Sequence, residues 1–517
     1  MAEGYTQIFQ SGPLLMVMAS LITGLAWLFY LIQPALLASF SAKYGSFRWV
    51  DGSPGFLEFI ELSCKCVFHA GELFTVAYKL LKTANGLLLI PFPHSPTGFL
   101  LLLPKELIAE YARQPESIVS FHTYVRNAMH AKYSLFGDNV LDNNIQKPIV
   151  YRELFQKLPD KMDMMNEELV MAINDGVTAN LDSHGEISIN MWDTATAILS
   201  RASNRIIAGH PLCRNQEYLD AAVHYAVSMF SLAVYLRFIP PFLRPLLASL
   251  VRRPLSRDRD IVAKHAIPVI EERMKMIEEA EIKGVEPKLP NDLLSAALKV
   301  ARKDSNSKLE YTPMMMVNRI LAFNFLQSYS NTLTVTNAVY DLTSLPQAEF
   351  DRTVTDTRAE LSWELRRPNA WSHDFSLRAN PIGEVELERT ITSKDGFTFS
   401  NGLHVPHGAI LAAPLKAIQQ DPANYPGGFN PRRASEDLIR PTVTTITPVF
   451  LNFGLGRPAC PGRWFAVNMQ KLTLSHLLLE YDFQRVDARP PGVRKGTLVE
   501  PCGRSKITLK RRIVVDQ

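Results

Sequence analysis

The sequence predicts an α+β fold in which helices dominate, with small β-sheets near both ends of the chain and one transmembrane helix at the N-terminus. Three patterns predict it: an apolar run without charge near the N-terminus, charged stretches of helical character through the middle, and short apolar or β-branched runs interrupted by proline towards both ends. Of the 517 residues, 47% are hydrophobic and 21% are charged, which is typical of a globular protein. This composition excludes a disordered or collagen-like chain.

The N-terminal run has the length of a membrane span. No charged residue lies between Glu3 and Lys43, and the stretch from Leu14 to Ile32 is almost wholly apolar. At about 1.5 Å per residue it would reach roughly 28 Å, close to the thickness of a hydrocarbon core. The alternative, a buried core helix, fits such a charge-free stretch less well. We therefore expect residues 1–40 to form a single-pass anchor and residues 41–517 to form one domain. Because the first basic residues follow the span, we expect that domain on the cytoplasmic side.

The rest of the chain alternates between short strands and helices. Leu87–Ile90 and Phe99–Leu103 read as buried strands joined by a turn. Leu232–Val251 is apolar but contains two adjacent prolines, so we expect two short helices with a kinked link, which either touch a membrane surface or pack in the core. Arg253–Lys308 predicts long helices with a solvent-exposed edge. From Leu342 to Gly408 the composition shifts towards turn-forming residues and short strands.

Charge and cysteine content narrow the functional classes. The chain has 55 Lys and Arg against 51 Asp and Glu, a net charge of +4. So small an excess argues against a nucleic-acid-binding protein. Five scattered cysteines do not form a disulfide framework, which indicates a reducing compartment for most of the chain.

The chemistry is concentrated around Cys460. The segment reads Phe453-Gly454-Leu455-Gly456-Arg457-Pro458-Ala459-Cys460-Pro461-Gly462, a glycine-rich loop followed by an apolar helical pattern. Pro461 suits the first position of a helix, and a cysteine at a helix N-terminus has its thiolate favoured by the helix dipole and by nearby Arg457. Gly462 leaves room for a flat group to approach the helix. A planar haem with its iron on Cys460 fits these features better than the alternative for a single cysteine, a small buried hydrophobe.

This segment resembles the cysteine-loop signature of the cytochrome P450 family: a Phe, two residues, a Gly, three residues, a Cys, one residue and a Gly. The resemblance is greatest to fungal membrane-bound members that oxidise secondary metabolites, many of them terpenoids. It extends to 201–205, 211–219, 402–408 and 425–433. It implies the cytochrome P450 fold and a haem (iron protoporphyrin IX) whose iron is bound by the Cys460 thiolate, with Phe453, Gly456 and Gly462 shaping the haem-binding loop. By this resemblance Cys213 is structural.

The resemblance also implies an oxygen-side helix near residue 330. The position that normally carries a threonine falls on Ser330, whose hydroxyl would relay a proton as a general acid through water. The preceding acidic position is Tyr329, and the positions of small residues are Leu326 and Gln327. The alternative is that Ser330 only bonds back to a helix carbonyl.

A third family motif departs from its pattern. The family carries a helical Glu-x-x-Arg paired with a second arginine; its arginine matches Arg378, but the glutamate position holds Phe375. Removing one partner of a buried ion pair costs about 3–5 kcal/mol. Two other spacings of this kind exist, Glu364 with Arg367 and Glu386 with Arg389. Either Glu364 has moved into the role, or the stretch 346–378, which is short for the family, reflects an altered coding sequence or a damaged protein.

Two sets of basic residues have expected partners. Arg389 matches an arginine that pairs with a haem propionate. Arg457, Arg463 and Lys471 flank the cysteine loop and either dock an acidic electron donor or form a solvated rim.

The sequence therefore predicts a haem-thiolate monooxygenase of a small hydrophobic molecule, terpenoid-like by analogy. The resemblance implies O2 as co-substrate and electrons from NADPH through a separate cytochrome P450 reductase, because no dinucleotide motif is present. It also implies a catalytic domain on the cytoplasmic face of the endoplasmic reticulum membrane. Two alternatives stay open: a haem-thiolate isomerase that needs no reductase, and a degenerate member without catalysis.

Overall fold

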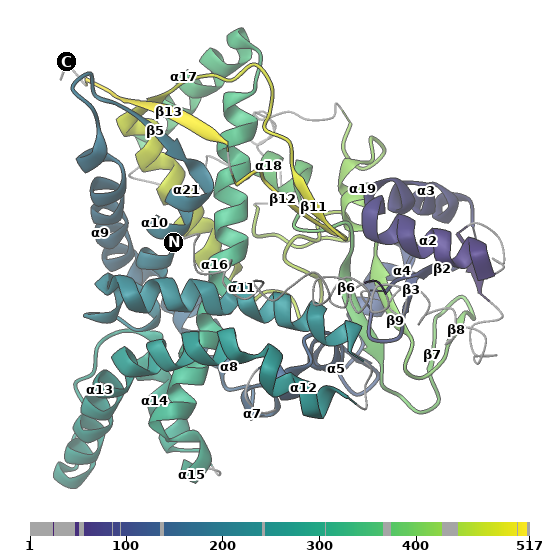
Figure 1. Ribbon diagram of the computed structural model, residues 1–517, viewed down its shortest axis with the longest axis horizontal. Helices are drawn as coiled ribbons and strands as arrows, with labels where there is room; N and C mark the ends of the chain where they lie inside the picture. Colours follow the sequence, from purple (N-terminus) through teal and green to yellow (C-terminus); the bar gives the residue numbers. More distant parts are fainter. Residues whose placement is uncertain are drawn as a thin grey trace, which may run out of the picture.

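Helices make up most of the structure, and most of its strands gather to one side of them (Figure 1). The computed structural model describes residues 24, 47–50, 56–84, 86–93, 95–134, 139–239, 243–304, 307–364, 374–426, 443–503 and 505–513. Within these ranges no helix combines the length and apolar character that a membrane crossing needs. The expected anchor at residues 14–32 lies outside the described residues except for Gly24. A mainly helical fold with small sheets is confirmed.

The largest sheet joins the two ends of the chain. Its strand order is β1, β2, β3, β9, β6, β4. The strands are β1 (Arg48–Trp49), β2 (Leu88–Pro91), β3 (Phe99–Leu102), β9 (Ile410–Ala413), β6 (Glu386–Ile391) and β4 (Val119–Ser120). The antiparallel pair β2–β3 confirms the two strands expected from the sequence, and β3 then pairs in parallel with β9.

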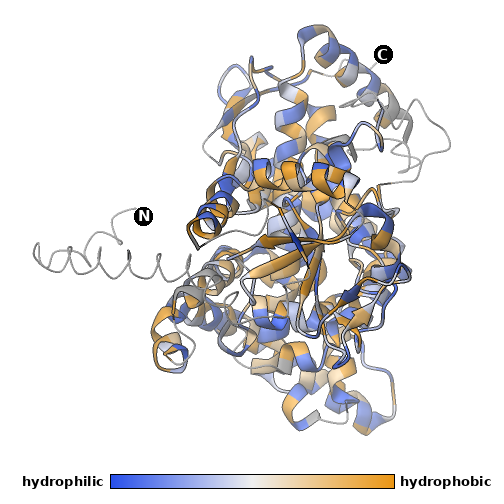
Figure 2. Cartoon of the chain, turned by 90° about the vertical axis from the view of Figure 1, so that its right-hand side faces the viewer, coloured by the Kyte–Doolittle hydropathy of each residue, from blue (hydrophilic) through white to orange (hydrophobic). Residues whose placement is uncertain are grey.

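Both faces of this sheet are covered, which explains its continuous apolar strands (Figure 2). Alternate residues such as Leu88 and Leu100 face α2 (Phe56–Phe68) and α3 (Ala70–Thr83). The intervening residues, such as Leu89 and Leu101, share a second core with α4 (Lys105–Ala112) and with Leu451. Leu451 begins the stretch that leads to Cys460, so the sheet supports the predicted site.

A long central helix organises the helical part. This helix is α16 (Pro313–Thr343). Thr312 is its N-cap, and the Thr312 hydroxyl accepts a hydrogen bond from Met315 N (3.3 Å). Its last thirteen residues, 331–343, are all buried, so no amphipathic stripe is needed there. Long helices pack against it: α10 (Met191–Ile207), α11 (Gln216–Phe238), α13 (Arg253–Lys283) and α21 (Arg463–Glu480). A further long helix, α9 (Pro159–Gly176), packs on α10 and α21.

A buried polar cluster ties α10, α11 and α16 together. The side chains of Asn204 and Asn324 exchange hydrogen bonds, with N–O distances of 2.7 and 3.2 Å. Tyr218 also donates to Asn204 Oδ1 (2.8 Å). All three residues are at most 1% exposed. Satisfied polar networks of this kind specify one packing arrangement, because an unpaired member would be costly.

The apolar stretch Leu232–Val251 agrees only in part with expectation. Its first part is the end of the long helix α11, and its second part is the separate helix α12 (Arg244–Val251). The expected break is therefore present, but the first helix is not short. On α12, Leu246 and Leu250 are 73% and 51% exposed, whereas Ala248 is buried.

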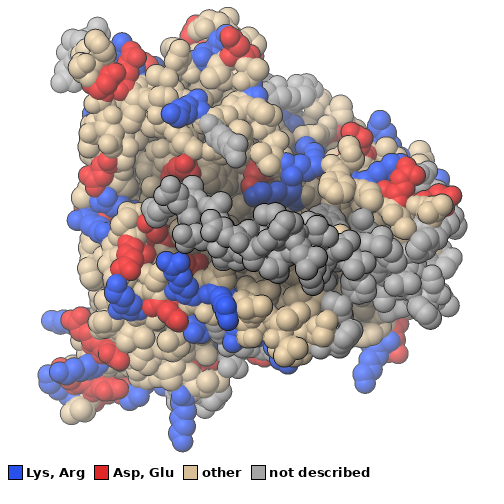
Figure 3. Space-filling model, viewed as in Figure 1, with Lys and Arg blue, Asp and Glu red and all other residues tan. Residues whose placement is uncertain are grey.

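Charged helices follow as predicted. The 31 residues of α13 are succeeded by α14 (Leu293–Arg302) and α15 (Ser307–Glu310). Side chains of both charges mix over the lower left of Figure 3, where α13 lies. The prediction of a solvent-exposed edge is right for α13, whereas α14 is mostly buried.

The other described elements are short, except for α17. They comprise α5 (Phe121–Ala128), α6 (Ala131–Ser134), α7 (Asn139–Asp142), α8 (Gln146–Tyr151), η4 (Arg152–Gln156), η5 (Thr178–Asn180), η6 (Leu212–Arg214), α17 (Gln347–Glu364), α18 (Asp374–Ala379), α19 (Leu415–Gln420), β5 (Glu186–Asn190), β7 (Phe397–Thr398), β8 (His404–Val405), β10 (Tyr481–Phe483), β11 (Val493–Lys495), β12 (Leu498–Glu500) and β13 (Lys506–Arg511).

Candidate functional site

Cys460 lies at the end of a closed loop directly before α21. Its backbone N–H donates to Phe453 O (2.9 Å), and Gly454 N–H donates to Leu451 O (2.8 Å). The helix begins at Arg463, with Gly462 as its N-cap, so Pro461 precedes the helix instead of opening it. The sequence prediction of a glycine loop followed by a helix is confirmed, with the boundary two residues later.

Gly456 is required by the loop geometry. Its φ is +77°, in the left-handed region that favours glycine. A Cβ atom built there would lie 1.9 Å from the carbonyl oxygen of Ala112 at the end of α4. Only a residue without a side chain therefore allows the loop to lie against α4.

The surroundings of the Cys460 sulfur shift the pKa of this thiol in opposite directions. Burial is the largest and raises the pKa of the thiol. Backbone N–H groups of Gly462 and Arg463 donate to the sulfur, and the Arg463 charge acts in the same lowering direction. The net direction is upward in the haem-free chain, although the helix start and an arginine, here Arg463, act in the lowering direction that the sequence predicted. A bound metal ion deprotonates such a thiol, and the donors already in place would then stabilise the thiolate.

Arg463 also holds the cysteine backbone. Its Nη1 donates to Cys460 O (2.8 Å) and its Nε to Thr444 O (2.9 Å). The guanidinium lies 3.5 Å from the ring centroid of Trp464. Arg463 was one of three basic residues expected at a docking surface, but its side chain binds the cysteine loop.

Arg389 lies next to the cysteine loop. It is 1% exposed on β6, and its guanidinium donates to Leu455 O (2.6 Å) and Ala112 O (3.3 Å). Within the described part of the chain, no carboxylate oxygen lies within ion-pair distance of this buried charge. Burial lowers the pKa of Arg389. A buried cation whose described hydrogen bonds go to carbonyl oxygens fits the expected role of pairing with an anionic group such as a propionate.

Ser330 is half-buried on α16, the long helix that the sequence predicted here. The hydroxyl that bonds back to a helix carbonyl is that of Thr334, which donates to Ser330 O (2.9 Å). Across the described residues the Ser330 hydroxyl makes no hydrogen bond of its own, which argues against the back-bonding alternative. The next residue, Asn331, accepts from Gln470 of α21 (2.6 Å). The helix of Ser330 is therefore fastened to the helix that follows Cys460.

Tyr329, at the expected acidic position, is linked to an acid elsewhere in the chain. Its hydroxyl donates to Glu500 Oε1 of β12 (2.8 Å). Burial and the Glu500 charge raise the pKa of the Tyr329 phenol, so it is a neutral donor. The sequence could not reveal this pairing, because the two residues are 171 positions apart.

One alternative for the third motif is wrong. Glu386 and Arg389 both lie on strand β6, so they cannot form a helical Glu-x-x-Arg. Position 375 and Arg378 do lie on one helix, α18. Arg378 is 6% exposed, and its guanidinium lies 4.7 Å from the ring centroid of Tyr425. The side chains of Glu364 and Phe375, and the whole of Arg367 and Arg433, lie outside the described residues.

Two carboxyl groups near the loop were not recognised as site residues from the sequence. Burial raises the pKa of Glu386 to about 8 and that of Glu388 to about 7. Glu386 is close enough for its charge to act on both Arg389 and Cys460. Strand alternation could not have identified them, because β6 is irregular between Glu386 and Arg389, where Leu387 has a φ of +64°.

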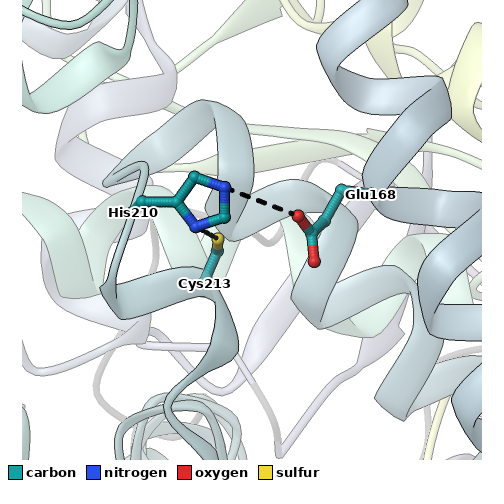
Figure 4. Close-up of side chains that lie close together, drawn as sticks. All are labelled: Glu168, His210 and Cys213. Atoms are coloured by element: carbon teal, nitrogen blue, oxygen red, sulfur yellow. Dashed lines mark hydrogen bonds and ion pairs between the residues drawn. The ribbon is translucent and has the colours of Figure 1, made fainter.

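A second cluster of possible metal ligands is structural. Figure 4 shows the His210 ring between Glu168 and Cys213, with one nitrogen towards each. Glu168 already accepts short hydrogen bonds from Arg201 (2.6 Å) and Arg214 (2.9 Å). Burial raises the pKa of Cys213 to about 11. The His210 ring separates Glu168 from Cys213, and two arginines already bind the Glu168 carboxylate. Both features disfavour a bound cation, so the structure supports the structural role expected for Cys213.

The residues around Cys460 fit a haem. The half-buried Cys460 has a sulfur that receives two backbone N–H donors, and a glycine follows two residues later. The buried Arg389 beside the loop donates its described hydrogen bonds to carbonyl oxygens and lies over the Tyr111 ring. These features match a thiolate ligand, a flat group and an anionic substituent, respectively. Cys460 would hold the iron, and Arg389 would face a propionate.

Comparison with known proteins identifies similar chains. Residues 376–507 match the family model described as Cytochrome P450. Cytochrome P450 monooxygenase 151 of Postia placenta is 30% identical over 424 residues, which cover 77% of this chain and 81% of the relative. Cytochrome P450 monooxygenase gloP of Glarea lozoyensis is 29% identical, covering 80% and 82%. Cytochrome P450 monooxygenase AN1598 of Emericella nidulans is 27% identical, covering 95% and 92%.

The two loop glycines are expected to respond differently to alanine. Gly456→Ala forces a left-handed backbone and a contact with Ala112 O, and should lower the free energy of unfolding by about 1–3 kcal/mol. Gly462→Ala meets only Val150 Cγ1, at 3.7 Å, and should leave the stability of the haem-free chain unchanged. Thermal and denaturant unfolding measure both.

Bound haem per chain provides the second measurement. It should fall in Gly462→Ala, because the new methyl group occupies the side that a flat group would approach. Wild-type stability in Gly456→Ala, or undiminished haem in Gly462→Ala, would contradict this account of the loop.

Proposed function

The chain belongs to the cytochrome P450 family and is a haem-thiolate monooxygenase, and from this premise we propose that Cys460 is its iron ligand and that it oxidises a hydrophobic small molecule. The family uses haem, O2 and a redox partner. The observation that carries the assignment is the closed loop at Cys460, where the backbone N–H groups of Gly462 and Arg463 point at the sulfur. When bound, the haem supplies activation of O2 and transfer of one oxygen atom to the substrate.

The chain's own residues would position the reacting groups. Cys460 holds the iron through its sulfur, while Arg463 keeps the cysteine carbonyl in place. Arg389 neutralises an anionic substituent of the haem beside the loop. The α16 helix supplies Ser330, whose hydroxyl donates a proton through water and is replenished from solvent. Tyr329 remains neutral and fixes this part of α16 to β12 through Glu500.

We propose a terpenoid-like substrate and a separate NADPH–cytochrome P450 reductase. The substrate class rests on the resemblance of the cysteine loop and the flanking stretches to fungal enzymes of secondary metabolism. The reductase rests on the absence of a dinucleotide motif from the sequence. Because the Arg463 side chain is hydrogen-bonded to the cysteine loop, the exposed Arg457 is the better candidate for docking an acidic partner.

We further propose that the protein is held on the cytoplasmic face of the endoplasmic reticulum. The charge-free stretch 14–32 would span the bilayer. The α12 helix would touch its surface, since Leu246 and Leu250 are exposed one turn apart and Arg252 and Arg253 follow them. Their exposure favours membrane contact over the alternative of core packing.

Cys460→Ala is expected to abolish haem binding, because no other side chain of the loop can ligate the iron. The measurement is the carbon monoxide difference spectrum of reduced membranes, in which the thiolate-type Soret band should vanish. Cys213→Ala, which removes a buried thiol outside the loop, should retain the band. Bound porphyrin and product formation unchanged in Cys460→Ala would refute the assignment.

Ser330→Ala is expected to uncouple the enzyme. Loss of the hydroxyl should reduce product formed per O2 consumed by at least about 10²-fold, the lower range for general acid catalysis. Haem content should stay normal. Ser330→Thr keeps the hydroxyl and serves as the matched control. Equal coupling in the alanine and threonine variants would show that Ser330 plays no part in proton delivery.

Deleting residues 1–40 is expected to remove the integral anchor. The full chain should resist extraction by alkaline carbonate, whereas the truncated chain should be extracted. In the truncated chain, Leu246→Asp with Leu250→Asp should weaken residual binding to vesicles, because both apolar contacts are lost. Extraction of the full chain under the same conditions would count against a membrane span.

A further inference from the structure

Gln419 is a fully buried amide between α18 and the stretch that leads to Cys460. It lies on α19 and is 0% exposed. Its side-chain oxygen accepts from Leu451 N–H (3.1 Å) and from Asn452 Nδ2 (3.0 Å). Its side-chain nitrogen donates to Arg378 O (3.4 Å). Because Leu451 N–H can only donate, the amide orientation is determined by the network.

These hydrogen bonds act where the cysteine loop begins. Leu451 is itself 0% exposed, so water cannot replace Gln419 as the acceptor of its N–H. Leu451 O in turn accepts from Gly454 N–H, and Phe453 O accepts from Cys460 N–H. A short series of backbone bonds therefore connects the Gln419 amide to the cysteine.

Gln419 is also the link from this loop to Arg378. The sequence has Phe375 where the family carries the glutamate of its third motif. In the structure, Arg378 Nη1 donates to the Gln419 backbone carbonyl (3.5 Å), and the Gln419 side chain returns a bond to Arg378 O. The neighbouring Gln420 repeats the connection through Ala379 O (3.0 Å). Hydrogen bonds through α19 therefore add to the direct packing of Leu377 of α18 against Phe450 and Phe453.

We propose that Gln419 is a positioning residue for the haem site, whose amide sets where the cysteine loop begins and hence where Cys460 Sγ lies relative to the iron. The proposal rests on the assignment of Cys460 as the ligand. It does not depend on the substrate. A displaced sulfur forms a weaker bond to the iron, which changes the spectrum of the bound haem.

Gln419→Met tests the proposal, since methionine has a similar length but offers neither strong acceptor nor donor. In the reduced carbon monoxide complex, the ratio of haem outside the thiolate-type Soret band to haem within that band should rise about tenfold. That ratio corresponds to about 1.4 kcal/mol. Gln419→Glu should restore most of the thiolate form, because a buried, neutral carboxyl group keeps an accepting oxygen and a donor.

Two controls separate positioning from stability. Ile418→Ala removes a buried side chain from the same helix; it should lower the melting temperature of the haem-free chain and leave the spectral ratio of the folded fraction unchanged. Gln420→Ala removes one exposed hydrogen bond and leaves the buried Gln419 amide in place, so it should change neither quantity. The ratio is compared at equal folded fraction, so a destabilised Gln419→Met remains informative.

Each possible result either supports or overturns the proposed role of Gln419. A Gln419→Met spectrum equal to that of Ile418→Ala would overturn the proposal. If the wild-type chain shows no thiolate-type band, the assignment of Cys460 fails and this inference falls with it. A raised ratio confined to Gln419→Met and restored in Gln419→Glu supports it.

Discussion

The hydrogen bond from Cys460 N–H to Phe453 O is the constraint on which the site depends. It closes a loop whose turns need positive φ at Gly454 and Gly456, and it leaves the sulfur at the start of α21, where backbone N–H groups are free of helical partners. Arg389 and Arg463 then bind loop carbonyls from two sides. This short segment is held against α4 by the large sheet, by α16 and by the residues that pack beneath the loop.

The sequence predicted those structural features whose pattern lies within one short segment of the chain. The cysteine loop, the pair β2–β3 and the long helix around Ser330 are contiguous, and each carries its signal in spacing or apolar runs. Relations across the fold could not be predicted. Tyr329 meets Glu500, and Gln419 meets Leu451, only because distant segments pack together. The sequence revealed the helix end that lowers the pKa of the Cys460 thiol, but not the burial that raises it.

The departure at the third motif has a structural counterpart. A buried arginine without its usual carboxylate on the same helix still needs polar partners. For Arg378 the described partners include a carbonyl of α19 and the ring of Tyr425. A ring face attracts a cation without demanding a second buried charge. Among the described residues, the network around Gln419 thus supplies Arg378 with neutral hydrogen-bond partners.

The parallel pairing of β3 with β9 joins residues about 300 positions apart, so the sheet cannot close until most of the chain exists. At about 5–20 residues per second, the ribosome needs roughly 15–60 s to supply the second strand after the first. During that interval the edge of β3 that later pairs with β9 has no partner strand, and an unpaired strand edge favours aggregation. Because Cys460 follows β9 in the sequence, a haem held by its sulfur can bind only after both strands have been synthesised.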